Sequence, residues 1–126
     1  MIILDSDFIV SYLMEDQSTH EKAGKMANNI EHKQCFITNL VKYEVVNVLS
    51  IKYSQSAATS AWSYMSDIID VVWVDTTIEN LTWVEFSKHT NKNISIVDCV
   101  NVVLANKLKA KIASFDRFYG DLRVLV

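Results

Sequence analysis

Short apolar runs alternate along this 126-residue chain with longer segments in which apolar residues recur every three or four positions. The short runs are typical of strands buried on both faces of a parallel sheet, and the periodic segments are typical of amphipathic helices. We expect strands at 2–4, 35–37, 71–74 and 112–115, and the pattern allows a fifth at 123–126. Helices are expected at 6–14, 19–30, 40–53, 55–69, 76–90 and 95–108. This alternation predicts an α/β domain with a mainly parallel central sheet and right-handed crossovers.

The composition fits a single domain covering residues 1–126. Half of the residues are hydrophobic, and the absence of proline together with only two glycines argues against long flexible linkers. Cys35 and Cys99 lie in apolar surroundings without a metal-binding spacing, so we expect reduced core residues of a cytoplasmic protein. We see neither a signal peptide nor an apolar run of roughly 20 residues, and therefore expect a soluble intracellular chain without membrane contact.

Two acids come directly after predicted strands, Asp5 after the first and Asp116 after the fourth. Because the carboxyl ends of parallel strands meet at the edge where open α/β folds bind ligands, we expect both acids there. Asp5 could instead cap the next helix, although Ser6 could do so equally well, and Asp116 alone could be a turn residue. Asp75 also follows a strand, but its Asp-Thr-Thr context predicts a helix cap, and we leave it out of the site.

Glu44 is unusual because it shares one face of its predicted helix with the apolar residues Leu40, Val41, Val48 and Ile51. Burying a carboxylate costs several kcal/mol unless a cation or hydrogen-bond donors compensate. Glu44 is therefore either a partly buried functional acid or an edge residue that reaches water. It lies one turn inside the helix, so its side chain can still reach the edge of the sheet.

Asp98 belongs to the segment Ser95-Ile96-Val97-Asp98, which matches a capping box at the start of a helix. That geometry places the carboxylate at a helix N-terminus, at the rim of the sheet. Capping is compatible with metal binding because a carboxylate has two oxygens. Asn101, one turn further along, could donate or accept a hydrogen bond beside Asp98.

Converging carboxylates would repel each other strongly unless cations compensate their charge. Hard divalent cations such as Mg²⁺ or Mn²⁺ prefer oxygen ligands, and no His-rich or Cys-rich set favours zinc. The net charge of −3 is weak evidence against a nucleic-acid substrate, because bound cations would offset these acids. Ser6 has no matching His and Asp set for serine hydrolase chemistry, and no Gly-rich phosphate loop is present. Asp7 is a possible helper without independent support.

Four short motifs in this order and spacing resemble the PIN domain family, and specifically the VapC-type toxins of bacterial and archaeal toxin–antitoxin pairs. They are Ile3-Leu4-Asp5-Ser6, Glu44 within the helix of 38–49, Ser95-x-x-Asp98, and Ser114-Phe115-Asp116-Arg117-Phe118. The resemblance covers almost the full chain. Asp7 is a departure, because it stands where many members have a small or neutral residue.

The resemblance implies a three-layer α/β/α fold and metal-dependent cleavage of RNA by an acidic quartet. The residues carried over are Asp5, Glu44, Asp98 and Asp116, with Ser6 and Ser95 at the supporting hydroxyl positions. We expect Asp5 and Asp98 to be the most direct ligands of one or two Mg²⁺ or Mn²⁺ ions, which would activate a water for attack on the phosphodiester.

The resemblance also implies homodimers and inhibition by a small antitoxin protein. Trp62, Tyr64 and Trp83 are candidates for such protein-binding surfaces, with packing in the core as the alternative for each of them.

Two other functions remain open. The segment Leu4-Asp5-Ser6-Asp7 fits the strand-terminal Asp-x-Asp of haloacid dehalogenase-type phosphatases, although no Asp-Asp pair follows a later strand. A catalytically silent PIN-like scaffold that binds RNA or a partner protein is the other alternative, and metal binding discriminates it from a nuclease.

Overall fold

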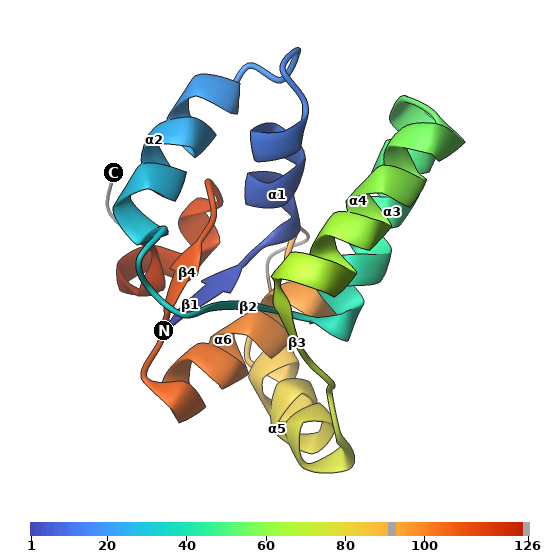
Figure 1. Ribbon diagram of the computed structural model, residues 1–126. Helices are drawn as coiled ribbons and strands as arrows, with labels where there is room; N and C mark the ends of the chain where they lie inside the picture. Colours follow the sequence, from blue (N-terminus) through green and yellow to red (C-terminus); the bar gives the residue numbers. More distant parts are fainter. Residues whose placement is uncertain (91–92, 125–126) are drawn as a thin grey trace.

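The central sheet has four parallel strands in the order β3-β2-β1-β4 (Figure 1). The computed structural model describes residues 1–90 and 93–124. Ile3 of the central strand lies opposite Phe36 on one neighbour and Ile112 on the other. The strands are β1 Ile2–Leu4, β2 Cys35–Thr38, β3 Asp70–Val72 and β4 Lys111–Ala113.

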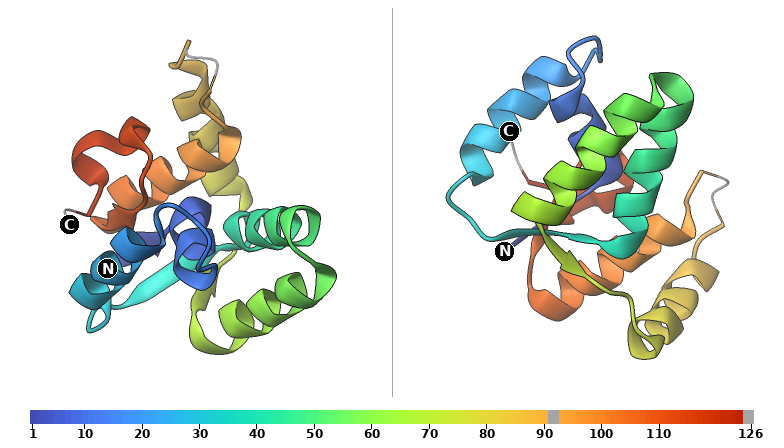
Figure 2. Two further views of the ribbon diagram at one scale, coloured as in Figure 1. Left: turned by 90° about the horizontal axis from the view of Figure 1, so that it is seen from above. Right: turned by 45° about the vertical axis from the view of Figure 1, so that its right-hand side comes forward.

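Helices cover both faces of this sheet (Figures 1 and 2). Helix α3 packs against α4, and α5 packs against α6. The two helix pairs lie on opposite sides of the sheet, the first with one half of the core and the second with the other. The three-layer α/β class predicted from the sequence is therefore confirmed. The helices are α1 Ser6–Leu13, α2 His20–Ile30, α3 Asn39–Lys52, α4 Gln55–Ile68, α5 Thr76–Ser87, α6 Ile96–Leu108 and the 3-10 helix η1 Arg117–Leu122.

The core is divided by the sheet because successive strand residues point to opposite faces. Ile2 and Leu4 of β1 pack with α1 to α4, whereas Ile3 packs on the other face with α6. In β4, Ala113 and Ile112 divide in the same way. The apolar runs are thus buried on both faces, as their composition predicted.

Several boundaries differ from the prediction, and one of them affects the site. Strand β4 ends at Ala113, two residues earlier than expected, so Asp116 does not end the strand but lies at the start of η1. The expected fifth strand is reduced to a single parallel bridge between Arg123 and Ile112, and 125–126 lie outside the described residues. Short strands whose ladder ends in a turn are poorly delimited by hydrophobicity alone.

Two of the three aromatic residues proposed for protein-binding surfaces are exposed, whereas the third, Tyr64, packs against the core. Trp62 and Trp83 are 39% and 65% exposed, and Tyr64 is half-buried. The two cysteines are free thiols, Cys99 buried and Cys35 half-buried. Among the described residues, no helix has the length and apolar character needed to cross a bilayer.

Two aliphatic residues of α3 test the assignment of its buried face. We expect Leu49→Ala to lower the free energy of unfolding by about 2–5 kcal/mol, because Leu49 is fully buried between the sheet and its neighbouring helices. Ile51→Ala is the matched control: Ile51 is 87% exposed, so we expect a change within about 0.5 kcal/mol. Urea unfolding followed by circular dichroism measures both, and equal losses would contradict the burial pattern.

Candidate active site

Asp5 is the most deeply buried acid at the carboxyl edge of the sheet, with 4% of its surface exposed. It follows β1 directly and caps α1, since its Oδ1 accepts a hydrogen bond from the Ser6 amide at 2.9 Å. Asn101 of α6 donates from Nδ2 to the same oxygen at 3.1 Å. Ser114, just after β4, lies 2.9 Å from Oδ2 with its hydroxyl. Three segments that are distant in sequence therefore converge on one carboxylate.

The Ser114 hydroxyl connects Asp5 with two further acids. Its Oγ lies 3.1 and 3.2 Å from the two carboxylate oxygens of Asp7, and it accepts a hydrogen bond from the Asp116 amide at 3.0 Å. A hydroxyl carries one proton, so it can donate to Asp5 or to Asp7 but not fully to both. Asp7 has a second donor in the Phe115 amide at 3.0 Å. The hydrogen-bond donors around Asp5 and Asp7 are thus too few to compensate fully for two ionised carboxylates.

Asp98 enters the centre from α6. The predicted capping box is present, with the Ser95 hydroxyl accepting from the Asp98 amide and Asp98 Oδ2 accepting from the Ser95 amide, each at 3.0 Å. The other oxygen, Oδ1, accepts from the Tyr119 hydroxyl at 3.2 Å. Asn101 Nδ2 donates to that same hydroxyl at 3.1 Å. Asn101 and Tyr119 therefore connect Asp98 with Asp5.

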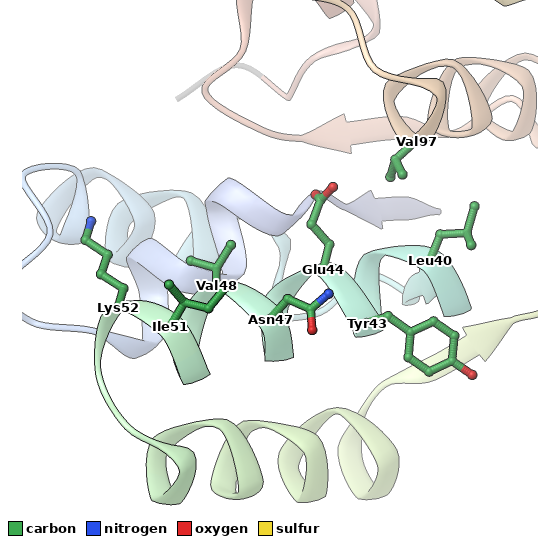
Figure 3. Close-up of a pocket in the computed structure, with 8 residues that line it drawn as sticks. All are labelled: Leu40, Tyr43, Glu44, Asn47, Val48, Ile51, Lys52 and Val97. Carbon is green, nitrogen blue, oxygen red and sulfur yellow. The ribbon is translucent and has the colours of Figure 1, made fainter.

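Glu44 joins the centre through Ser6, whose hydroxyl donates to Glu44 Oε1. Glu44 is half-buried, and its side chain points from α3 toward the start of α6, where Val97 lies (Figure 3). The face around it is not a buried stripe, because Val48 and Ile51 are exposed. These residues line an open, mostly apolar groove of about 650 Å³ beside Glu44, together with Leu40, Tyr43, Asn47, Lys52 and Val97 (Figure 3).

Asp116 is connected to the cluster by its backbone. It is half-buried and caps η1, with Oδ1 accepting from the Phe118 amide at 2.9 Å. Its own amide donates to Ser114. Asp75 was left out of the site because its context predicts a helix cap. It does cap α5, accepting a hydrogen bond from the Ile78 amide at 2.9 Å.

Burial and like charges both disfavour ionisation of Asp5 and Asp7. Burial raises the pKa of Asp5 to about 7, with further increases from the charges of Asp7 and Asp98, against the Ser114 and Ser6 hydrogen bonds that lower it. Burial also raises the pKa of Asp7. The pKa of the Tyr119 hydroxyl is raised by burial and by the nearby acids, so it remains a hydrogen-bond donor.

No lysine, arginine or histidine side chain forms an ion pair with these acids among the residues that the structure describes. The two ion pairs found there, Lys25–Glu21 and His89–Glu85, lie outside the cluster. The same residues contain no group of three or more His, Cys, Asp or Glu side chains arranged to hold a metal ion. The acids are connected through Ser6, Ser114, Asn101 and Tyr119 instead of closing a cage. Such an all-oxygen set fits Mg²⁺ or Mn²⁺, since Mg²⁺ binds through one or two carboxylates and keeps several waters.

Three residues of the centre were not among the site residues predicted from the sequence. Ser114 belonged to a quoted motif, and its signal is a hydroxyl that directly follows an apolar strand. Asp7 was only a possible helper. Tyr119 carried no signal, because an aromatic residue near the C-terminus is equally typical of core packing.

The fold and the cluster define the class: a parallel α/β/α domain with an acidic centre at the carboxyl edge of its sheet. A profile of the PIN domain family matches residues 2–123, and the chain therefore belongs to that family. A search of curated proteins by sequence found no match.

Solved structures share the fold at low sequence identity. Mycobacterium tuberculosis VapC20, described as a toxin that cleaves the sarcin–ricin loop, superposes with a TM-score of 0.86 at 19% identity, covering 94% of this chain and 92% of its own. FitAcB from Neisseria gonorrhoeae gives 0.69 at 15% identity over 100% and 97% of the two chains. A toxin–antitoxin complex from Klebsiella pneumoniae gives 0.69 at 12% identity over 99% and 97%. At these identities the similarity establishes the fold.

The raised pKa of Asp5 predicts a pH-dependent stability of the metal-free protein. Its folded pKa of about 7 exceeds the ordinary value of 3.8, so the folded state binds this proton more tightly than the unfolded chain. The stabilisation is complete below about pH 4 and is lost as the pH rises through 7. In EDTA, we therefore expect Asp5→Asn to raise the melting temperature at pH 8 and to change it little at pH 4.

The matched control is Asp75→Asn, which alters an exposed cap outside the cluster and should retain the pH profile of the parent. Differential scanning calorimetry between pH 4 and 8 compares the three proteins. Parallel profiles for the parent and Asp5→Asn would contradict the assigned shift.

Proposed function

We propose that this chain is a metal-dependent endoribonuclease, the VapC-type toxin of a type II toxin–antitoxin pair, acting in the cytoplasm. The observation that carries the proposal is the buried Asp5 carboxylate, which faces Asp7 and Asp98 without a basic partner in the described part of the chain. Such a centre becomes favourable when hard cations neutralise it. Family membership and the structural similarity to VapC20 support RNA as the substrate.

In this mechanism the acids divide into two roles. Asp5 and Asp98 are the most direct ligands of Mg²⁺ or Mn²⁺, and Glu44 and Asp116 complete the site or orient water. When bound, the cation lowers the pKa of a water and offsets charge developing on the scissile phosphate.

The remaining groups hold these carboxylates in place. Ser6 orients Glu44 by donating a hydrogen bond from its hydroxyl to the carboxylate. The Ser95 capping box keeps Asp98 at the N-terminus of α6. The positive end of a helix dipole favours negative charge, so the N-terminus of α6 is a favourable position for an acid. Ser114 separates Asp5 from Asp7 and orients the Asp116 amide.

A partner protein and a second copy of the chain are proposed to cover the exposed apolar surface. The groove along α3 carries Ile51 at 87% exposure, and Trp83 on α5 is also largely exposed. Toxin–antitoxin complexes among the structures of the same fold support an antitoxin as the partner. A short reading frame beside this one is the natural place to look for it.

We expect the purified protein to cut RNA in Mg²⁺ or Mn²⁺ and to lose this activity in EDTA. Asp5→Asn and Asp98→Asn should each reduce cleavage by about 100-fold or more, because each removes a carboxylate charge that would hold the cation. Gel analysis of a panel of structured RNAs, including tRNA and ribosomal RNA fragments, measures the products.

Asp75→Asn is the control, because it changes an acid that follows a strand but lies outside the cluster, and it should cleave like the parent. Full metal-dependent cleavage by Asp5→Asn would contradict the assignment. A parent protein that neither cleaves RNA nor binds Mn²⁺ would support the silent-scaffold alternative.

We expect the chain to form a homodimer in solution and to form a stable complex with the antitoxin when both are co-expressed. Burial of apolar side chains drives such association. Light scattering coupled to size exclusion gives both masses. A monomer that also fails to retain the neighbouring gene product would contradict the proposed partners.

A further inference from the structure

Asn101 is a fully buried amide on the inner side of α6, and it is in contact with the acidic centre. Its Nδ2 donates to Asp5 Oδ1 and to the Tyr119 hydroxyl, each at 3.1 Å. Tyr119, itself 3% exposed, donates onward to Asp98 Oδ1 at 3.2 Å. These three hydrogen bonds form an unbroken chain between two carboxylates that are 93 positions apart in sequence.

The direction of every proton in this chain follows from its two ends. In the ionised form that a cation requires, Asp5 and Asp98 can only accept, so the Asn101 amide must then present its NH₂ group to Asp5, and Tyr119 must donate to Asp98. The NH₂ group has two protons, which serve Asp5 and the Tyr119 oxygen. With the amide turned over, Oδ1 would face the Asp5 oxygen, and the only proton of Tyr119 would be drawn away from Asp98.

The carbonyl oxygen of Asn101 supports this orientation. Oδ1 is buried and has no hydrogen-bond partner among the described residues. A buried unpaired oxygen is unfavourable, so the amide is held by its donors and not by its carbonyl. Asn101 therefore acts as a hydrogen-bond donor, to Asp5 directly and to Asp98 through Tyr119.

We propose that Asn101 and Tyr119 are positioning residues that set the separation and orientation of Asp5 and Asp98 for a divalent cation. This inference rests on the proposed function, and it concerns how the two ligands are held. Like charges push the two carboxylates apart. The hydrogen bonds from Asn101 and Tyr119 oppose this repulsion, and both residues are buried away from water. Groups that orient metal ligands in this way affect metal affinity by about 10–100-fold.

The test measures binding of Mn²⁺ alone to the RNA-free protein, by electron paramagnetic resonance and isothermal titration calorimetry. Tyr119→Phe keeps the buried ring, which packs against Phe118, and removes only the hydroxyl. We expect it to raise the Kd for Mn²⁺ by about 10–100-fold. In RNA cleavage, the Mn²⁺ concentration for half-maximal rate should rise by a similar factor, whereas the KM for RNA should stay unchanged.

Tyr53→Phe is the matched control. Tyr53 also donates its hydroxyl to an aspartate, Asp16 at 2.6 Å, but it makes no hydrogen bond to the acids of the centre, so its loss should leave the Kd for Mn²⁺ unchanged. Asn101→Leu removes both hydrogen bonds that the side-chain amide donates and keeps a side chain of similar size. It should weaken Mn²⁺ binding at least as much as Tyr119→Phe. Combining the two changes should weaken binding less than the product of their separate factors, because they interrupt one chain.

The outcomes separate this inference from the function on which it rests. If the parent binds Mn²⁺ and Tyr119→Phe binds it within twofold of the parent, the positioning role is wrong while the metal-dependent function stands. A lower melting temperature of Tyr119→Phe with unchanged Mn²⁺ affinity has the same meaning, since it indicates a structural role alone. A parent that binds no Mn²⁺ overturns the metal-dependent function and this inference together.

Discussion

A carboxylate that is buried at the end of the central strand controls the arrangement of everything around it. Transferring an ionised group from water into a protein interior costs several kcal/mol unless donors or cations replace its hydration. For Asp5 the replacements come from the start of α1, the middle of α6 and the residue after β4. They do not fully compensate, because Asp7 and Asp98 add negative charge, and the pKa of Asp5 remains raised. The same imbalance that weakens the metal-free centre favours a cation.

The acids serve the fold as well as the proposed chemistry. Asp5, Asp98 and Asp116 each accept a backbone amide at the beginning of α1, α6 or η1. One carboxylate oxygen is occupied in this way, and the helix N-terminus favours the negative charge. Asparagine can replace aspartate as a cap because it also offers a side-chain oxygen. Substitutions of this type therefore separate the chemical role of each acid from its structural one.

Glu44 is the exception, since it lies within α3 and caps nothing. Its carboxylate is held by Ser6, while the same face of α3 opens onto the apolar groove (Figure 3). Whatever covers that groove will lie beside one of the four candidate acids. The groove proposed for a partner protein and the acidic centre are thus neighbours on one helix, so a partner bound there would lie close enough to affect the proposed chemistry.

The local sequence determined the elements and the acids at their ends. Apolar runs predicted strands buried on both faces, Asp5 was placed at the edge of the sheet, and the Ser95–Asp98 capping box formed as expected, because each depends on residues within a few positions. Tertiary structure decided the rest. Val41, Val45 and Leu49 of α3 face the core, whereas Val48 and Ile51 face the groove, a division set by which neighbours pack against the helix.

The connections within the centre depend still more on tertiary structure. Ser114 and Asn101 meet Asp5 across 109 and 96 positions, respectively. Local periodicity carries no information about such contacts, since they arise from the order in which the strands join the sheet. The sequence by itself thus determined that Asp5 follows a strand and that Asp98 begins a helix. Only the packing of distant segments brought Asp7 and Glu44 into the centre and decided which hydroxyls and amides hold the acids there.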